Sequence, residues 1–295
     1  MEKNKQKRLF LRRQIPLTIV IAVFTLACLM PMYLVVINSF GDEAAILKLG
    51  YRLVPGRFSL SAYRAIFYPG SSIFRSYRLT VFITFLGTLI AVVITYLCGF
   101  VLADKKLEYR NYFALFFFVT TVFNPGLVPW YMISRALGMY NNIWALIVPG
   151  LVFSPFNMFL IRNYINGVPS ELMESAEIDG AAPLRIVFQI YMPVCKPVLA
   201  TIFLFYALGY WNNYFNAVML VDDSKLYPLQ MMLFQIQSNL NMLRELTSVS
   251  ISSKDIPTES FKMAAAVVTT GPIVLLYPFL QRYFTKGLII GAVKG

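Results

Sequence analysis

Residues 174–193 read ESAEIDGAAPLRIVFQIYMP, a polar segment between two long apolar stretches. The acids in and just before it are Glu171, Glu174, Glu177 and Asp179. The glutamates are three residues apart, so they line one face of a short helix. Asp179-Gly180 is a helix stop, because glycine adopts the left-handed conformation without strain. A second short helix begins near Pro183, since proline is tolerated in a first turn. The segment predicts a helix–turn–helix along a membrane surface.

Six stretches around this segment are apolar throughout and contain no Asp, Glu, Lys or Arg. About 20 helical residues cover the ~30 Å hydrocarbon thickness of a bilayer, and each stretch is about that long. Backbone groups cannot stay unpaired in lipid, so each stretch is predicted to be a helix. The stretches are 15–38, 79–103, 111–134, 142–161, 197–221 and 263–281. The sequence therefore predicts an all-α polytopic membrane protein with six transmembrane helices.

The composition supports a membrane location and leaves few side chains that could act in catalysis or bind a metal. Hydrophobic residues make up 58% of the 295 residues and charged residues 14%, whereas about a quarter of a soluble domain is charged. Histidine, the commonest general base and metal ligand, is absent, and the three cysteines are scattered. We therefore expect no metal site, no cofactor and no catalytic residue in this chain. The net charge of +12 fits basic cytoplasmic loops, and no basic run has the interleaved aromatics of a nucleic-acid site.

Basic residues predict the orientation, because Lys and Arg collect in short cytoplasmic loops. The N-terminal arm at 1–14 and the loop DKKLEYR at 104–110 are dense in them. Both are predicted to be cytoplasmic, which with six spans places both termini inside (N-in/C-in). The polar segment then lies inside as well. The loops predicted to face outward are 39–78, 135–141 and 222–262.

Residues 174–193 resemble the EAA loop of permease subunits of ATP-binding-cassette (ABC) importers. That pattern is Glu-Ala-Ala, three residues, Gly, nine residues, then Ile-x-Leu-Pro. Here Glu174-Ser175-Ala176 is followed at the same spacing by Gly180 and by Ile190-Tyr191-Met192-Pro193. Two positions depart conservatively, Ser175 in place of Ala and Met192 in place of Leu.

The resemblance implies a type I ABC importer permease fold and a set of partners. In that family the loop docks into a cleft of an ATPase subunit, with Glu174 in a charged contact, Ala176 packed against the ATPase and Gly180 making the turn. The implied partners are a second homologous permease, two ATPases that bind ATP-Mg, and an extracytoplasmic solute-binding protein, at a bacterial cell membrane. The residues expected to couple to the ATPase are Glu174, Ser175, Ala176, Asp179, Gly180, Ile190 and Pro193. By composition alone, the segment is equally compatible with a solvated interfacial hairpin.

The C-terminal stretch QRYFTKGLIIGAVKG (281–295) resembles the tail of sugar-importer permeases of the maltose-transporter type, and 58–67 and 261–284 are similar to the same class. In that class the tail enters the interface between the ATPases. The resemblance implies this role for Gly287, Gly291 and Lys294, although a frayed terminus also suits small residues. The predicted organisation is an N-terminal arm (1–14), a permease domain (15–284) with a coupling loop (171–193), and a cytoplasmic tail (285–295).

Span five contains YALGYWNNYFNAV (206–218), which is unusually polar and aromatic for a membrane helix. Amides buried in a span face other helices or a water-filled path, and hydroxyls, amides and flat rings suit sugars. The substrate-pathway candidates are Tyr210, Trp211, Asn212, Asn213, Tyr214, Asn216 and, in span four, Asn157. Helix–helix packing and an interfacial aromatic belt explain the same residues equally well. Pro155 is expected to kink span four.

The leading hypothesis is a permease subunit that forms half of the pathway for a sugar or oligosaccharide and works by alternating access. A secondary, ion-coupled transporter is the first alternative, but no predicted span holds an acidic or basic residue. A membrane enzyme would have only Tyr and Cys for acid–base chemistry in the spans. An ABC permease for an acidic or phosphorylated non-sugar solute is the remaining alternative. No GxxxxGK[ST] loop is present, so ATP hydrolysis is assigned to a separate subunit and this chain is not predicted to be an enzyme. The sequence does not identify which sugar is transported or which ATPase binds. It also does not show which of the two permeases holds the substrate, or whether the host is Gram-positive or Gram-negative.

Overall fold

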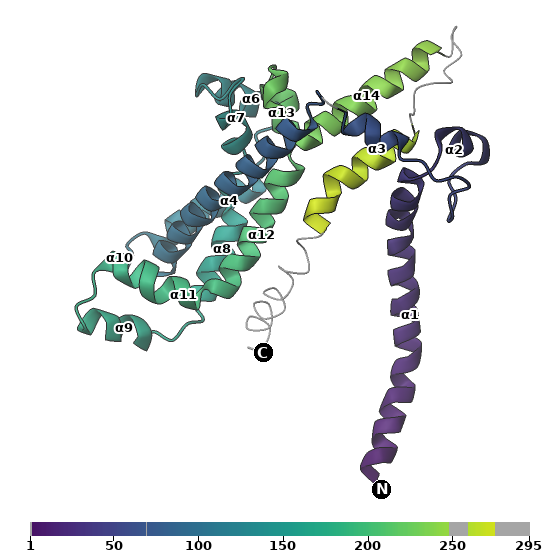
Figure 1. Cartoon of the computed structure of the whole chain (residues 1–295). Helices are drawn as coiled ribbons and strands as arrows, with labels where there is room; N and C mark the ends of the chain where they lie inside the picture. The colour runs from purple at the N-terminus through teal and green to yellow at the C-terminus, as the bar shows by residue number, and fades with distance from the viewer. Residues whose placement is uncertain (1, 69, 248–258, 275–295) are drawn as a thin grey trace. The chain divides into compact units, whose positions relative to one another are not determined.

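The computed structural model of the chain describes residues 2–68, 70–247 and 259–274 (Figure 1). Within these residues every regular element is a helix, and one isolated β-bridge joins Gly41 to Phe58. The prediction of an all-α protein is therefore confirmed for the part of the chain that is described. The chain divides into two compact units: unit 1 comprises 1–71 and 236–270, and unit 2 comprises 72–235 and 271–295.

Unit 1 begins with one long helix, α1 (Glu2–Ser39), followed by α2 (Glu43–Leu49) and α3 (Ser61–Ile66). The side chain of Asn38 fixes the loop that follows α1. Its Nδ2 donates to the carbonyl of Arg52 at 3.0 Å, and its Oδ1 accepts from the N–H of Arg52 at 3.1 Å. Both ends of this buried amide are thus paired with loop backbone, as buried polar groups require.

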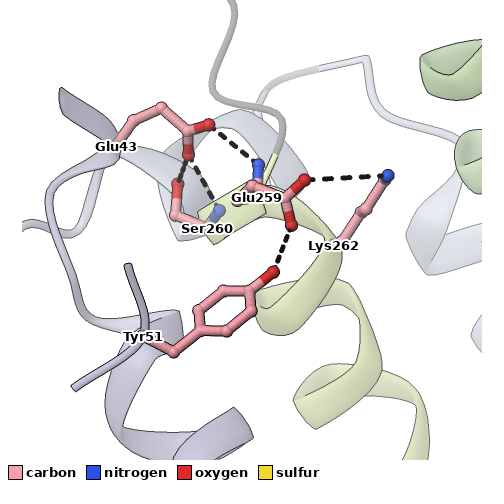
Figure 2. A network of polar contacts seen from close by, with 5 residues as sticks. All are labelled: Glu43, Tyr51, Glu259, Ser260 and Lys262. Atoms are coloured by element: carbon pink, nitrogen blue, oxygen red, sulfur yellow. Dashed lines mark hydrogen bonds and ion pairs between the residues drawn. The ribbon is translucent and has the colours of Figure 1, made fainter. Parts of the chain in front are cut away.

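Glu43 caps a helix from a distant part of the sequence (Figure 2). Its carboxylate accepts from the backbone N–H groups of Glu259 and Ser260, both at 2.8 Å, and from Ser260 Oγ at 2.7 Å. These N–H groups start the helix at 259–274 and have no acceptor within it. Tyr51 donates to Glu259 Oε2 at 2.6 Å. Negative charge at a helix N-terminus is favourable, so Glu43 ties the loop after α1 to this helix.

Replacing Glu43 by alanine is expected to destabilise the protein by about 1–2 kcal/mol, because two helix N–H groups lose their acceptor. The measurement is the midpoint of thermal unfolding in detergent. Glu43→Gln keeps one acceptor oxygen and is the matched control, with a smaller loss. Equal midpoints for Glu43→Ala and the parent would show that the cap adds no stability.

Helix α4 (Ile73–Ala103) is the centre of unit 2 and packs against α8 (Pro155–Ile165) and α12 (Lys196–Asn212). Small residues let membrane helices approach closely. Gly87 is such a residue in α4: a Cβ added there would lie 2.5 Å from Cζ of Tyr210. The bulky ring therefore fits only because Gly87 has no side chain.

Buried hydrogen bonds link α4 to the rest of unit 2. The hydroxyls of Thr95 and Tyr206 lie 2.6 Å apart, and the Tyr206 hydroxyl also accepts from the N–H of Ser154 at 2.9 Å. Nearer the other end of α4, Thr80 Oγ1 accepts from the N–H of Leu229 at 2.8 Å. These bonds attach α4 to the start of α8, to α12 and to the start of α14.

Helix α5 packs against α4 and α8, and several shorter elements lie at the two ends of this three-helix core. Figure 1 shows α9 and α10 at one end and α6, α7 and α13 at the other. Helix α14 starts in unit 2 and ends beyond it. The elements are α5 (Arg110–Val122), α6 (Leu127–Ala136), α7 (Trp144–Ile147), α9 (Glu171–Ile178), α10 (Pro183–Arg185), η1 (Ile186–Tyr191), α11 (Met192–Val194), α13 (Phe215–Leu220), η2 (Ser224–Leu226) and α14 (Leu229–Thr247).

Two single helices are long and apolar enough to cross a membrane, Pro16–Ser39 and Ile73–Ala103. The first overlaps the predicted span 15–38, and the second contains the predicted span 79–103. Two bent pairs also qualify if each pair is one crossing. The described residues thus contain two to four candidate spans by length and composition. The bent pairs are Arg110–Val122 with Leu127–Ala136, at 116°, and Pro183–Val194 with Lys196–Asn212, at 84°.

The predictions of one continuous helix over 111–134, over 142–161 and over 197–221 are wrong, because helices end inside these stretches at Val122, Ile147 and Asn212. Helix α7 ends at Ile147 and α8 begins only at Pro155. Pro155 therefore starts a helix instead of kinking one, and Ser154 caps that helix by accepting from the N–H of Asn157 at 3.4 Å. Proline has no N–H and clashes with a preceding helical turn, so the first turn is its strain-free place.

Candidate coupling site and pathway residues

The coupling loop (residues 171–193) forms the predicted helix–turn–helix. Gly180 follows α9 with φ of +70°, and α10 begins at Pro183. The N–H groups of Gly180 and Ala181 both donate back into the last turn of α9 at 3.0 Å. These two hydrogen bonds form a Schellman motif, which pairs the last helical carbonyls and fixes the turn. The left-handed glycine turn inferred from the sequence is confirmed.

The second half of the coupling loop turns the chain into α12. Ile190 lies in the π-helical η1 and Pro193 lies in α11. Between Val194 and Lys196 the helix axis changes direction by 84°. Proline cannot donate to the helix ladder, and π segments accompany such irregular helices. The chain therefore changes direction just after Pro193.

Ala176 faces the core of its own subunit. It is 6% exposed and belongs to the same hydrophobic cluster as Ala103 and Tyr191. The packing of Ala176 against an ATPase stays a prediction. In this chain the side chain holds α9 against the rest of unit 2. In contrast, Glu174, Ser175 and Asp179 are exposed.

Lys106, in the loop after α4, holds Glu177 of α9. Its Nζ donates to both carboxylate oxygens of Glu177, at 3.0 and 2.8 Å. The Lys106 N–H donates to Asp104 Oδ1 at 2.8 Å, which shapes the loop. The hydrogen bond that Lys106 donates to Glu177, together with the negative charge of Glu177, raises the pKa of Lys106 above its ordinary value. Both side chains are well exposed, so water screens the pair and it adds little to stability. The ion pair instead fixes the position of α9 relative to the loop after α4.

A hollow of about 210 Å³ separates this loop from α9, and Glu174, Glu177 and Lys106 are among its lining residues. Glu174 is exposed, and no ion pair involves it among the described residues. It remains available as a charged contact at the surface of the coupling loop.

Both halves of the coupling loop are attached to α4. Lys106, three residues after the end of α4, holds the first half through Glu177. Tyr96, within α4, donates to the carbonyl of Val187 in the second half at 2.7 Å, and this bond is buried. A displacement of the coupling loop must therefore move α4 or break these contacts.

Two large apolar side chains flank the turn of the coupling loop. Ile178 is 85% exposed and Leu184 is 71% exposed. The sequence analysis missed them because it considered only the acidic face and the turn. Their positions on either side of Gly180 could have indicated that they lie at the exposed turn. Apolar side chains this exposed beside an acidic face are typical of a surface that another protein covers.

Most of the predicted pathway residues are turned into the protein. Tyr210 is fully buried and donates to the carbonyl of Ile147 at 2.9 Å. Asn216 Nδ2 donates to the carbonyl of Pro149 at 2.8 Å. Trp211 and Asn157 are also buried. These four side chains fit the alternative of helix packing better than that of sugar contact. Asn212, Asn213 and Tyr214 lie where α12 ends, and Gly287, Gly291 and Lys294 lie outside the described residues.

The described residues contain two to four candidate membrane spans and a polar helix–turn–helix between apolar helices, which are features of a membrane protein. The family described as "binding-protein-dependent transport system inner membrane component" matches residues 96–290. The chain belongs to this family. The resemblance to ABC importer permeases, drawn from the coupling loop, is thereby confirmed.

Similar proteins include carbohydrate permeases. Protein LplC of Bacillus subtilis (strain 168) is 35% identical over 270 residues, which is 90% of each chain. The polygalacturonan/rhamnogalacturonan transport system permease protein YtcP of the same organism is 36% identical, covering 92% of this chain and 95% of YtcP. A chain in the crystal structure of a bacterial ABC transporter that imports the acidic polysaccharide alginate has a TM-score of 0.80 and 28% identity, covering 95% of this chain and 98% of that one.

Proposed function

We propose that this chain forms half of the translocation pathway of a bacterial carbohydrate importer. It crosses the cell membrane six times with both termini in the cytoplasm, beside a second homologous permease. The supporting observation is the coupling loop, where a Schellman-capped turn at Gly180 separates two short helices at the spacing of the EAA pattern. Exposed Glu174, Ile178 and Leu184 supply the charged and apolar contacts for an ATPase subunit.

The energy comes from two partner ATPases that bind ATP-Mg, and an extracytoplasmic binding protein delivers the solute. The family description, binding-protein-dependent transport, supports the second partner. The sequence contains no phosphate-binding GxxxxGK[ST] loop, which supports a separate ATPase. This chain acts without a catalytic residue of its own.

Within this chain, α4 transmits the movement. Closure of the ATPases displaces the coupling loop, and Lys106 and Tyr96 pass the displacement to α4. The buried bonds from α4 to Tyr206 and to the N–H of Leu229 extend it to α12 and to the start of α14. Packed helices move as units because their interfaces do not deform continuously. The pathway therefore opens alternately to the two sides.

The names of the relatives support an oligosaccharide as the solute. YtcP is named for polygalacturonan and rhamnogalacturonan, and the structural neighbour imports alginate. At 28% identity another relative, MelC of Bacillus subtilis (strain 168), is named for melibiose, raffinose and stachyose. A uronate-containing oligosaccharide is accordingly the first solute to test, with neutral oligosaccharides as the comparison.

The proposed topology is tested by cysteine labelling. In a variant without the native cysteines, Asp179→Cys is expected to react with a membrane-impermeant maleimide in inverted vesicles and not in right-side-out vesicles. Asp223→Cys, an equally exposed acid in the loop 222–262, is the control and is expected to show the opposite pattern. Labelling of Asp179→Cys in right-side-out vesicles contradicts the docking of an ATPase on the coupling loop.

A further inference from the structure

The short helix α3 is fixed to the end of α1 (Figure 1). The hydroxyls of Tyr63 in α3 and Ser39 at the end of α1 lie 2.7 Å apart. The ring of Tyr63 also stacks on Phe40, with centroids 4.9 Å apart and planes inclined by 27°. The N–H of Ser59, just before α3, donates to the carbonyl of Phe40 at 2.8 Å. Helix α3 is therefore held beside the end of α1 by side chains and by backbone.

The length of α1 defines the depth of α3 in a bilayer. The membrane-length part of α1, Pro16–Ser39, has 24 residues, which extend about 36 Å at a rise of about 1.5 Å per residue. The hydrocarbon layer of a bilayer is about 30 Å thick. A crossing by this segment therefore leaves Ser39 just beyond the hydrocarbon, among the lipid headgroups. Because Tyr63 is bonded to Ser39, α3 lies at the same level.

Helix α3 has a buried side and an exposed apolar side. Ala62 and Ile66, one helical turn apart, are buried. The large apolar side chains that remain exposed in and beside α3 are Phe58, Leu60, Phe67 and Tyr68. Aromatic side chains collect at membrane–water interfaces, because their rings suit the headgroup layer. The exposed side of α3 therefore has the composition of a surface that lies in that layer.

Arg64 lies on the exposed side of α3, one turn after Leu60. These two residues line two adjoining hollows, one completed by Phe58 and the other by Phe67 and Tyr68. Among the described residues, none forms an ion pair with Arg64. A guanidinium binds phosphate through two parallel N–H bonds. An arginine between aromatic hollows at headgroup depth thus matches the phosphate of a lipid in charge and in position.

We propose that Phe58, Leu60, Arg64, Phe67 and Tyr68 form a lipid-anchoring face. Its apolar side chains enter the outer leaflet at the hydrocarbon boundary, and Arg64 binds the phosphate of a lipid headgroup. This inference rests on the proposed topology, in which the loop 39–78 faces outward. Glu43 ties the loop after α1 to the helix at 259–274. The lipid-anchoring face therefore fixes the depth of both helices of unit 1 in the bilayer.

The test measures contact with lipid in the complete importer. The importer lacks the native cysteines and is reconstituted in phosphatidylethanolamine and phosphatidylglycerol, with a phospholipid that carries a nitroxide quencher near its headgroup. Leu60→Cys carries the fluorophore NBD, whose emission moves to shorter wavelength in apolar surroundings. Ala65→Cys with NBD is the matched control, because Ala65 is exposed but lies about 100° around α3 from Arg64 and lines neither hollow. Quenching at position 60 is expected to exceed that at position 65 at least about threefold.

Two further variants test the arginine in the Leu60→Cys importer. Arg64→Glu repels lipid phosphate and is expected to lower the quenching at position 60 about twofold. Arg64→Lys keeps the positive charge and is expected to retain most of the quenching. Equal quenching in the Arg64→Glu variant and the parent overturns the binding of phosphate by Arg64.

The emission and the quenching together separate lipid from the other possible occupants. Short-wavelength emission without quenching shows that the partner permease or the binding protein covers α3, and it overturns the lipid-anchoring face. Long-wavelength emission without quenching shows that this side of α3 lies in water, which overturns it as well. Dithionite added outside right-side-out vesicles reduces NBD in the outer leaflet only. Strong quenching combined with protection from dithionite therefore overturns the proposed topology and leaves the lipid contact intact.

Discussion

Replacing Gly180 by proline is expected to abolish ATP-driven uptake while the chain still inserts into the membrane. Gly180 has φ of +70° and donates its N–H into the last turn of α9. Proline holds φ near −65° and has no N–H, so the turn must open. The angle between α9 and α10 is then lost, and with it the surface formed by Glu174, Ile178 and Leu184. Uptake in proteoliposomes is expected to fall at least about tenfold, and the ATPase is expected to co-purify poorly.

Gly138→Pro is a matched control for this change. Gly138 follows α6 with φ of +73°, and its N–H donates to the carbonyl of Arg135 at 3.0 Å. The substitution therefore imposes the same backbone conflict at another helix end. It is expected to lower thermal stability similarly while the ATPase still co-purifies. Normal uptake by Gly180→Pro, or equal loss of the ATPase in both variants, would falsify the coupling role of the turn.

Reversing the charge of Lys106 is expected to uncouple the importer. In Lys106→Glu two carboxylates meet where a 2.8 Å ion pair stood, so the loop after α4 and α9 repel each other. Because the pair is exposed, the fold should persist. ATP turnover is expected to continue with uptake reduced several-fold, since the coupling loop then moves without one of its two attachments to α4.

The charge-swapped double variant, Lys106→Glu with Glu177→Lys, is the decisive comparison. It restores opposite charges in the same places and is expected to recover most of the uptake per ATP hydrolysed. Lys105→Glu alters the neighbouring lysine, for which no ion pair is formed among the described residues, and should leave coupling near the parent value. A double variant no better than Lys106→Glu alone would show that the ion pair does not transmit movement.

Local backbone chemistry made the coupling loop predictable. Gly180 tolerates a positive φ, and Pro183 suits a first helical turn, so both helix boundaries follow from single residues. The ion pair of Lys106 with Glu177 joins residues 71 positions apart, and only the packing of α9 beside the end of α4 brings them together. The basic loop at 104–110 had been recognised for its charge but not for this contact.

The interrupted helix over 142–161 and the burial of Tyr210 and Asn216 have one physical cause. Apolar composition indicates that a segment avoids water, but not that its helix is continuous. The break after α7 leaves the carbonyls of Ile147 and Pro149 without helical partners, and Tyr210 and Asn216 donate to them. Polar side chains in span five therefore satisfy backbone exposed by a break in span four. The need for side-chain donors to these carbonyls cannot be inferred from the sequence before the break in the helix is known.

The bare side chains of Ile178 and Leu184 also bear on the life of the protein before it is assembled. In the proposed topology, a newly made copy exposes these apolar side chains to the cytoplasm until an ATPase subunit binds. Such surfaces attract chaperones and proteases. Orphan copies are therefore expected to be short-lived, and cells making this chain without its ATPase should accumulate less of it.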